Sequence, residues 1–163
     1  MGSGKTTLGK QLANMLGYTF IDQDDAIEQI YGMTIAEVFT QYGESHFRKT
    51  ENQVLRDFIE TENVVISTGG GAPCFFDNME IVNSIGESVY LRISPAILAS
   101  RLKHAKAKRP IIKDKTDDEL HSFIVEKLAE REPFYFKAKH VIEGDNLKPE
   151  DIISLLPQIT ENQ

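Results

Sequence analysis

The stretch that decides the fold is Met1-Gly2-Ser3-Gly4-Lys5-Thr6-Thr7. Small residues followed by Lys and Thr are typical of a loop whose backbone N–H groups surround phosphate oxygens and lead directly into a helix. In such a loop the Lys5 ammonium binds the outer phosphates of a nucleotide, and the Thr6 hydroxyl can ligate the magnesium ion that accompanies ATP or GTP. Residues 2–7 are therefore predicted to form a nucleotide phosphate site.

The motif is incomplete at its beginning. The full pattern G-x-x-x-x-G-K-[ST] needs a glycine five positions before Gly4, which would fall before residue 1, and the strand that feeds such a loop is absent as well. A Gly/Ser-rich start or an artificial leader is the alternative interpretation. The following residues favour the phosphate loop, because they predict a helix directly after it: Leu8, Leu12, Met15 and Leu16 have helical spacing, and Gly17 stands where the helix would end.

Composition limits the classes of protein to consider. A length of 163 residues with 40% hydrophobic content predicts one domain with a substantial core, and a net charge of -7 argues against nucleic acid as a partner. The single cysteine, Cys74, fits a reducing compartment. No apolar run approaches the ~20 residues that cross a bilayer, so we expect a cytoplasmic protein without membrane contact. We expect a monomer, because no apolar stripe is left over once the predicted helices are packed. The histidines show no zinc-ligand spacing: His46, His104, His121 and His140.

An acidic cluster follows the first predicted strand, residues 18–21. Because side chains alternate along a strand, Asp22 and Asp24 should project to the same side of its carboxyl end, where parallel α/β sheets bind ligands. Two carboxylates there could serve magnesium and a substrate hydroxyl. Alternatively, the cluster simply caps the next helix through Asp24 or Asp25.

A charged pair lies on a helix predicted from Gly43 to Glu60. Arg48 and Glu51 are three residues apart and share a face of that helix. Such a spacing usually means a solvated surface pair. The functional alternative is that Glu51 holds Arg48 in place to receive a substrate carboxylate, which a guanidinium group matches in geometry.

Three consecutive glycines, Gly69 to Gly71, follow a second predicted strand at residues 64–67. The apolar character of that strand predicts burial on both faces. Glycines cost backbone entropy, so three together indicate a place where a ligand approaches the main chain closely, with a sharp turn as the alternative.

The rest of the chain continues to alternate between strand and helix patterns. Further strands are predicted at 88–93 and 140–143, and further helices begin at Ser94-Pro95, Thr116 and Lys148. This alternation predicts a parallel sheet with helices on both faces. Between Lys103 and Lys115 the chain is strongly basic around Arg109, as in a solvated loop or in a mobile lid that closes over phosphates.

Taken together, these pieces resemble the shikimate kinases, small P-loop enzymes that transfer the γ-phosphate of ATP to the 3-hydroxyl of shikimate. The resemblance covers essentially the whole chain, and its motifs occur in the family's order: M-G-S-G-K-T-T at 1–7, D-x-D at 22–24, F-R-x-x-E at 47–51, G-G-G-A at 69–72, R-P-I-I at 109–112 and R-E-P-F-Y at 131–135. Each motif alone is weak, whereas six in order are specific.

The resemblance implies a P-loop NTPase-type three-layer α/β sandwich formed as a single domain by residues 1–163. Its parallel sheet would have five strands, with helices on both faces. A substrate-binding helical region is expected at about 23–60 and a mobile lid at about 103–116.

For the nucleotide, the resemblance implies contacts to the ATP phosphates from Gly2, Ser3, Gly4, Lys5, Thr6, Thr7 and Arg109. Magnesium would be held by Thr6, with Asp22 acting through water. Arg109 would arrive with the lid against the transferring phosphate, so that Lys5 and Arg109 both serve catalysis.

For the substrate, the resemblance implies that Asp24 orients the reacting hydroxyl and is a candidate to take its proton. Arg48 and Arg131 would bind the shikimate carboxylate. Gly70 and Gly71 would contact the substrate through their backbone, while Glu51 orients Arg48.

Two departures from the family pattern stand out. The family's loop usually reads G-[YF]-M-G-[AS]-G-K, so Met1 matches a methionine inside that motif, and R-P-I-I replaces the commoner R-P-L-L. We therefore expect the native protein to carry a further segment before Met1 that forms the central first strand. Other readings are a P-loop kinase for gluconate or a nucleoside monophosphate, and a nucleotide-binding regulatory module without transfer activity.

Overall fold

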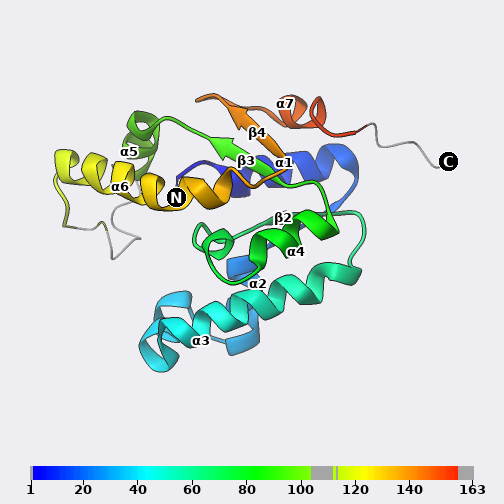
Figure 1. The fold of residues 1–163 in the computed structure, drawn as a ribbon, viewed down its shortest axis with the longest axis horizontal. Coiled ribbons are helices and arrows are strands. Elements are labelled where there is room, and N and C mark those ends of the chain that lie inside the picture. The colour runs from blue at the N-terminus through cyan, green and yellow to red at the C-terminus, as the bar shows by residue number, and fades with distance from the viewer. Residues whose placement is uncertain (1, 104–111, 113, 158–163) are drawn as a thin grey trace.

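The structure is a computed structural model that describes residues 2–103, 112 and 114–157 (Figure 1). Helices and strands alternate along it, in the order α1 (Lys5–Leu16), β1 (Thr19–Asp22), α2 (Gln23–Tyr31), α3 (Ile35–Asp57), β2 (Val64–Ser67), α4 (Asn78–Ile85), β3 (Val89–Arg92), α5 (Pro95–Lys103), α6 (Asp117–Tyr135), β4 (His140–Glu143) and α7 (Pro149–Ile153). A short 3-10 turn, η1 (Phe58–Glu60), follows α3, and a second one, η2 (Ala72–Cys74), precedes α4.

Most local sequence signals are confirmed. Strands β2 and β4 have the predicted bounds, and β1 and β3 differ from the predicted bounds by one residue at each end. Helix α6 begins directly after its N-cap Thr116, as predicted, and Thr116 and Thr34 form capping boxes at the starts of α6 and α3. Gly17 ends α1 in the left-handed conformation with φ 68°, which a residue with a Cβ rarely adopts.

Helix α3 begins well before the helix predicted from Gly43 to Glu60. It runs without a break in assignment from Ile35 to Asp57, but Gly43 inside it has φ 80° and ψ 167°. Glycine permits this kink because it has no Cβ to clash. The second half of α3 ends at Asp57, and the residues predicted to extend it form η1.

Helix α4 was not predicted, because it is short and lies next to turn-forming residues. Met79 and Ile81 are its buried apolar residues. It packs on α3 through a polar contact, in which Asn52 Nδ2 donates to Asn78 Oδ1 at 2.7 Å. The buried Asn78 in turn donates to the carbonyl of Ala72 at 2.7 Å, so α4 fixes the segment that follows the glycines.

The strands form two parallel pairs. In one pair β1 runs beside β2, with Thr19 opposite Val64 and Asp22 opposite Ser67. In the other, β3 runs beside β4, with Val89 opposite His140. Within the described residues no ladder joins β2 to β3. The parallel arrangement is as predicted, whereas a single continuous sheet is not observed.

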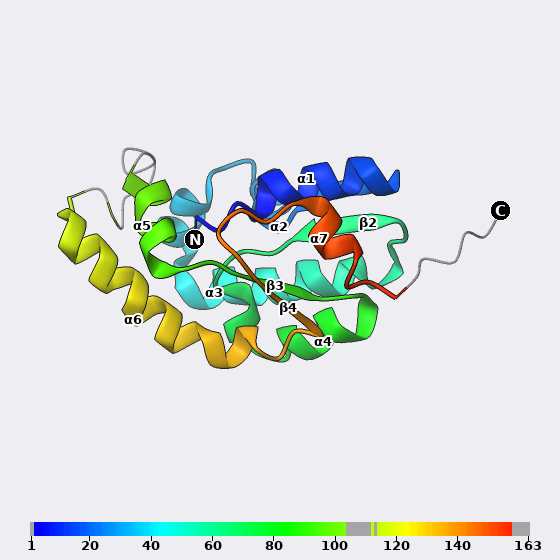
Figure 2. The same cartoon turned by 90° about the horizontal axis from the view of Figure 1, so that it is seen from above.

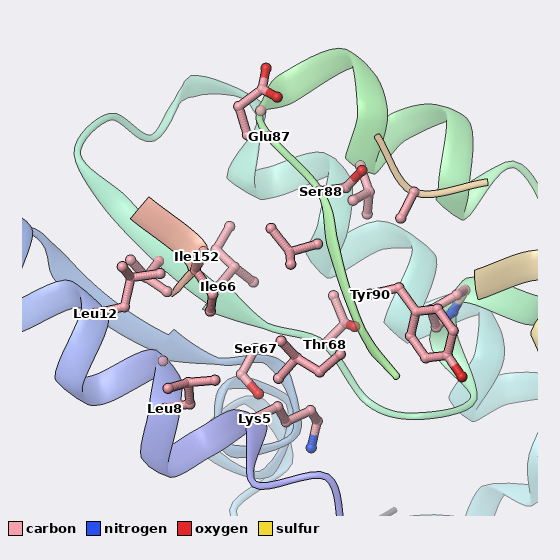
Figure 3. Close-up of a pocket in the computed structure, with 18 of the residues that line it drawn as sticks. Lys5, Leu8, Leu12, Ile66, Ser67, Thr68, Glu87, Ser88, Tyr90 and Ile152 are labelled. Atoms are coloured by element: carbon pink, nitrogen blue, oxygen red, sulfur yellow. The ribbon is translucent and has the colours of Figure 1, made fainter. Parts of the chain in front are cut away.

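A cavity of about 850 Å³ separates the two strand pairs. Figure 3 shows Leu8 and Leu12 of α1, Ile66 of β2 and Ile152 of α7 around it. Neighbouring strands of a sheet lie ~4.8 Å apart, so a space of this size explains why β2 and β3 do not pair directly. Its lining reaches from Ser3 and Gly69 at the carboxyl ends of the strands to Asn63 and Glu87 at the other end.

Helices lie on both sides of the strands. Helices α1 and α7 pack together on one side, and Figure 2 shows α4 on the other. Separate apolar clusters hold α2 to α3 and α5 to α6, centred on Ile27 and Leu120 respectively. No helix in the part of the chain that the structure describes has the length and apolarity needed to span a membrane.

Candidate active site

The predicted phosphate loop leads directly into α1, as the sequence indicated. Gly4 is the N-cap of α1 with φ 86°, and Gly2 has φ 70°, both in the left-handed region that favours glycine. The first intrahelical bond runs from Leu8 N to Gly4 O at 2.9 Å. The first N–H groups of a helix have no intrahelical partners, so those at Lys5, Thr6 and Thr7 are available to an anion.

Arg101 of α5 holds this loop by a hydrogen bond to its backbone. Its Nη1 donates to Ser3 O at 3.0 Å, and its Nη2 donates to Asp145 O at 2.6 Å. A guanidinium group has several donors in a fixed plane, which lets one side chain connect the loop to the turn after β4.

Asp22 connects the phosphate loop to the acidic cluster. The Thr6 hydroxyl donates to Asp22 Oδ2 at 3.0 Å, and Asp22 Oδ1 accepts from Asp24 N at 3.1 Å. The acidic cluster therefore does cap α2, but through a different residue from those expected. The N-cap is Asp22, and not Asp24 or Asp25. Capping leaves the Asp24 carboxyl free to face the glycine loop.

The Asp24 carboxyl occupies a crowded and partly buried position. A Cβ added to Gly69 would lie 2.8 Å from Asp24 Oδ1, so the side chain rests directly against the backbone. Burial raises the pKa of Asp24 above its ordinary value, and the nearby Asp22 adds to this, while Lys5 opposes it. The Lys5 ammonium at the start of α1 is thus one of the charges that act on the Asp24 carboxyl.

Arg48 and Glu51 form a buried ion pair, which excludes the alternative of a solvated surface pair. Arg48 Nη1 donates to Glu51 Oε2 at 2.6 Å, and only 1% of the Glu51 side chain is exposed. Glu44 accepts from the other edge of the guanidinium, at 3.0 Å from Nη2. The Phe75 ring lies 4.2 Å from Arg48 Cζ, a cation–π contact that fixes the plane of the group.

The three glycines bring the separate segments into contact. A Cβ on Gly71 would lie 2.7 Å from Arg48 Nη1, and one on Gly69 would lie 3.0 Å from Glu51 Oε1. Neither glycine has a positive φ, so close approach of side chains, and not backbone conformation, requires glycine here. Arg131 Nη1 donates to Gly70 O at 3.3 Å, and the Tyr135 hydroxyl donates to the same carbonyl.

The structure thus brings together nearly all of the predicted site residues at the carboxyl ends of β1 and β2. They are Lys5, Thr6, Asp22, Asp24, Arg48, Glu51, Gly70, Gly71 and Arg131, with Gly2, Ser3, Gly4 and Thr7 beside Lys5 and Thr6 in the chain. Arg109 and most of the predicted lid lie outside the described residues. The sequence analysis missed Glu44, four residues from Arg48, and Tyr135, four residues from Arg131, although both spacings were usable signals. It also missed Gln23, for which the sequence carried no signal.

A family model described as shikimate kinase matches residues 1–160. The chain belongs to the shikimate kinase family. It is accordingly an ATP-dependent phosphotransferase that acts on shikimate, in the biosynthesis of aromatic amino acids. The order of motifs found in the sequence therefore identified the family correctly.

Individual shikimate kinases are similar to this chain along most of their length. The enzyme of Bacteroides thetaiotaomicron is 50% identical over 148 residues, which are 91% of this chain and 85% of that protein. A crystal structure of shikimate kinase from the same organism has a TM-score of 0.90 at 46% identity, covering 95% of this chain and 93% of that one. A structure from Acinetobacter baumannii, described as in complex with shikimate, has a TM-score of 0.83 at 33% identity, covering 95% and 85%.

Proposed function

We propose that the chain transfers the γ-phosphate of ATP to the 3-hydroxyl of shikimate through two half-sites that meet at Asp24. The observation that carries this proposal is the position of the Asp24 carboxyl. It interacts with Lys5 on the nucleotide side and touches Gly69, next to Glu51 and Arg48, on the other side. Phosphoryl transfer depends chiefly on positioning and on neutralising charge, and this arrangement supplies both.

On the substrate side, Arg48 and Arg131 would hold the shikimate carboxylate. Glu51 and Phe75 already fix the guanidinium of Arg48, so little conformational entropy is lost when a carboxylate binds. Gly70 and Gly71 would contact the substrate through their backbone. Asp24 would then accept a hydrogen bond from the reacting hydroxyl and orient it toward the phosphate.

On the nucleotide side, the N–H groups at the start of α1 and the Lys5 ammonium would bind the phosphates. Magnesium would be held by the Thr6 hydroxyl and Asp22, which already contact one another at 3.0 Å. Hard oxygen donors of this kind suit Mg²⁺, which commonly takes its remaining ligands from phosphate and water. When bound, the ion neutralises phosphate charge.

The finer fold proposal is a five-stranded sheet, with a strand between β2 and β3. The cavity between these strands supports it, because the lining is largely apolar and runs along both of them, and it contains Ser67 Oγ, a buried atom for which the described residues offer no hydrogen-bond partner. A strand parallel to β2 would end beside Ser3, at the start of the phosphate loop. If a version extended by the upstream codons melts at the same temperature as residues 1–163, this proposal is wrong.

The remaining proposals concern organisation. We propose one domain over residues 1–163 acting as a monomer in the cytoplasm. The apolar clusters that join neighbouring helices support a single unit, and a free Cys74 suits a reducing compartment. Sedimentation at several protein concentrations would test the monomer.

The experiment that tests the function is a coupled assay of ADP release with ATP and magnesium, comparing shikimate, gluconate, a nucleoside monophosphate and no acceptor. Shikimate-dependent release, with the other acceptors at the background rate, is the expected result. Release that depends on gluconate or the nucleotide would contradict the acceptor. Tight ATP binding without acceptor-dependent release would instead indicate a regulatory module.

A further inference from the structure

The side chain of Gln23 lies at the junction of three segments that form the substrate half-site. Its exposed fraction is 0%, although it stands between Asp22 and Asp24 at the start of α2. Its Nε2 donates to Glu51 O at 2.9 Å, and its Oε1 accepts from Gly69 N at 3.2 Å. One buried amide thus connects α2, α3 and the glycine loop.

The chemistry of the partners dictates the orientation of this amide. A backbone carbonyl can only accept and a backbone N–H can only donate, so the Gln23 amino group must face Glu51 and its carbonyl must face Gly69. Both bonds lie in a buried region, where an unpaired polar group costs more than at the surface. The amide therefore holds its two partners at a fixed separation.

These contacts lie just beyond the end of the β1–β2 ladder. Its last pair is Asp22 opposite Ser67, and Gly69 follows Ser67 by two residues. Backbone hydrogen bonding between the two strands stops there, and the Gln23 side chain continues the connection to Gly69. The same glycine lies against the carboxylates of Asp24 and Glu51. A Cβ added to Gly69 would lie 2.8 Å from Asp24 Oδ1 and 3.0 Å from Glu51 Oε1.

We infer that Gln23 is a positioning residue that sets the distance between the hydroxyl-orienting carboxylate of Asp24 and the carboxylate-binding guanidinium of Arg48. Shikimate must reach both groups at once, so their separation determines whether the substrate fits. Asp24 is adjacent to Gln23 in the chain, while Arg48 is held by Glu51, whose carbonyl Gln23 binds. This inference rests on the roles proposed above for Asp24 and Arg48.

The test uses two apolar substitutions of similar volume, Gln23→Met and Gln23→Leu, in the full chain. Both remove the two hydrogen bonds while leaving the charges of the site unchanged. We expect kcat/KM for shikimate to fall by about 10- to 100-fold, as for small misplacements of reacting groups. The KM for ATP should stay within about twofold of wild type, because the phosphate loop is not attached to Gln23.

Two controls separate positioning from a loss of stability. Gln53→Met makes the same chemical change at an exposed position of α3, where Gln53 bonds only to Asp57 among the described residues. Ile152→Ala removes buried apolar volume from the cluster in which α7 packs on α1 and should lower the melting temperature. Both controls should leave kcat/KM for shikimate unchanged when measured well below the melting temperature.

Three outcomes would overturn the inference. The first is an unchanged kcat/KM for shikimate in folded Gln23 variants, and the second is an equal rise of both KM values. The third is failure of both variants to fold, because the amide would then maintain the fold and not the spacing of the site. A failure of the function itself is distinguishable, because wild type would then show no shikimate-dependent turnover at all.

Discussion

Arg48 Nη1 lies 2.6 Å from Glu51 Oε2 in a place where 13% of the arginine side chain and 1% of the glutamate side chain are exposed. Burial raises the pKa of Glu51, and the hydrogen bond and charge of Arg48 oppose that rise. A buried pair of this kind is costly to break from one side, because the remaining charge loses its partner. The guanidinium of Arg48 therefore has a defined position in this structure.

Replacement of this arginine should affect binding and stability together. Arg48→Ala should weaken the binding free energy of shikimate by about 2–5 kcal/mol, because a buried charged partner of the substrate carboxylate is lost. The weaker binding should appear as a higher KM for shikimate. It should also lower the free energy of unfolding by about 3–5 kcal/mol by leaving Glu51 unpaired. Steady-state kinetics and urea unfolding measure the two effects. An unchanged KM for shikimate would remove Arg48 from its role.

The combined variant Arg48→Met with Glu51→Leu provides the control for stability. Exchange of a whole buried ion pair for apolar side chains is often neutral or stabilising, so the unfolding free energy should recover while shikimate binding stays weak. Recovery of both properties would show that the pair has no part in binding.

A methyl group at Gly71 should disturb the site without changing its charges. The added Cβ would lie 2.7 Å from Arg48 Nη1, so Gly71→Ala should displace the guanidinium and raise the KM for shikimate by about tenfold or more. Gly86→Ala is the matched control, because a Cβ there meets no atom within 4 Å and the residue has φ -174°, an extended conformation open to alanine. Equal kinetics of the two variants would contradict this explanation of the glycine.

Much of this site could be predicted from the sequence because its residues belong to local patterns. The phosphate loop, the D-x-D segment and the glycines follow directly from short stretches in which backbone geometry is determined by residue type. Contacts between segments could not be read in the same way. Nothing around Gln23 distinguishes a buried amide from a polar residue at the start of a helix, and its partners Glu51 and Gly69 are 28 and 46 residues away.

The fold shows the same division between features set by local sequence and features set by contacts between distant segments. Capping boxes and strand patterns gave the bounds of most elements, because such signals act within a few residues. The burial of the Arg48–Glu51 pair depends on Phe75 and on the segment that α4 fixes, and a three-residue spacing on one helix carries no information about either. The separation of β2 from β3 is likewise a property of the assembled strands.

Arg101 allows the nucleotide half-site to be tested separately. Arg101→Ala removes the donors that hold Ser3 O and Asp145 O, so the phosphate loop should become more mobile and the KM for ATP should rise by about tenfold. The affinity for shikimate alone, measured by calorimetry without nucleotide, should remain within about twofold of wild type. A change confined to shikimate affinity would contradict the division into two half-sites.

The raised pKa of Asp24 leads to a prediction about stability and pH. The unfolded chain ionises near the ordinary value of 3.8, whereas the native protein retains the proton to higher pH, mainly because of burial. Native stability therefore falls as pH rises from 3.8 through the higher native pKa, and the cost remains in full above it. Asp24→Asn has no such cost and should be more stable than wild type at neutral pH.

Urea unfolding of wild type and Asp24→Asn at a series of pH values measures this difference. The advantage of the variant should shrink as the pH falls toward 3.8 and should be absent below it. An advantage that instead grows toward low pH would mean that the ionised carboxylate stabilises the native state.

The measurement that tests the central claim most directly is the turnover number of Asp24→Asn with saturating ATP, magnesium and shikimate, beside its dissociation constant for ATP. We predict a fall in kcat of about 10²- to 10⁴-fold, because the amide cannot take up the hydroxyl proton, with ATP affinity within about twofold of wild type. The exposed neighbour provides the control, and Asp25→Asn should keep the wild-type turnover. Wild-type turnover in Asp24→Asn would contradict the claim that the two half-sites meet at this carboxylate.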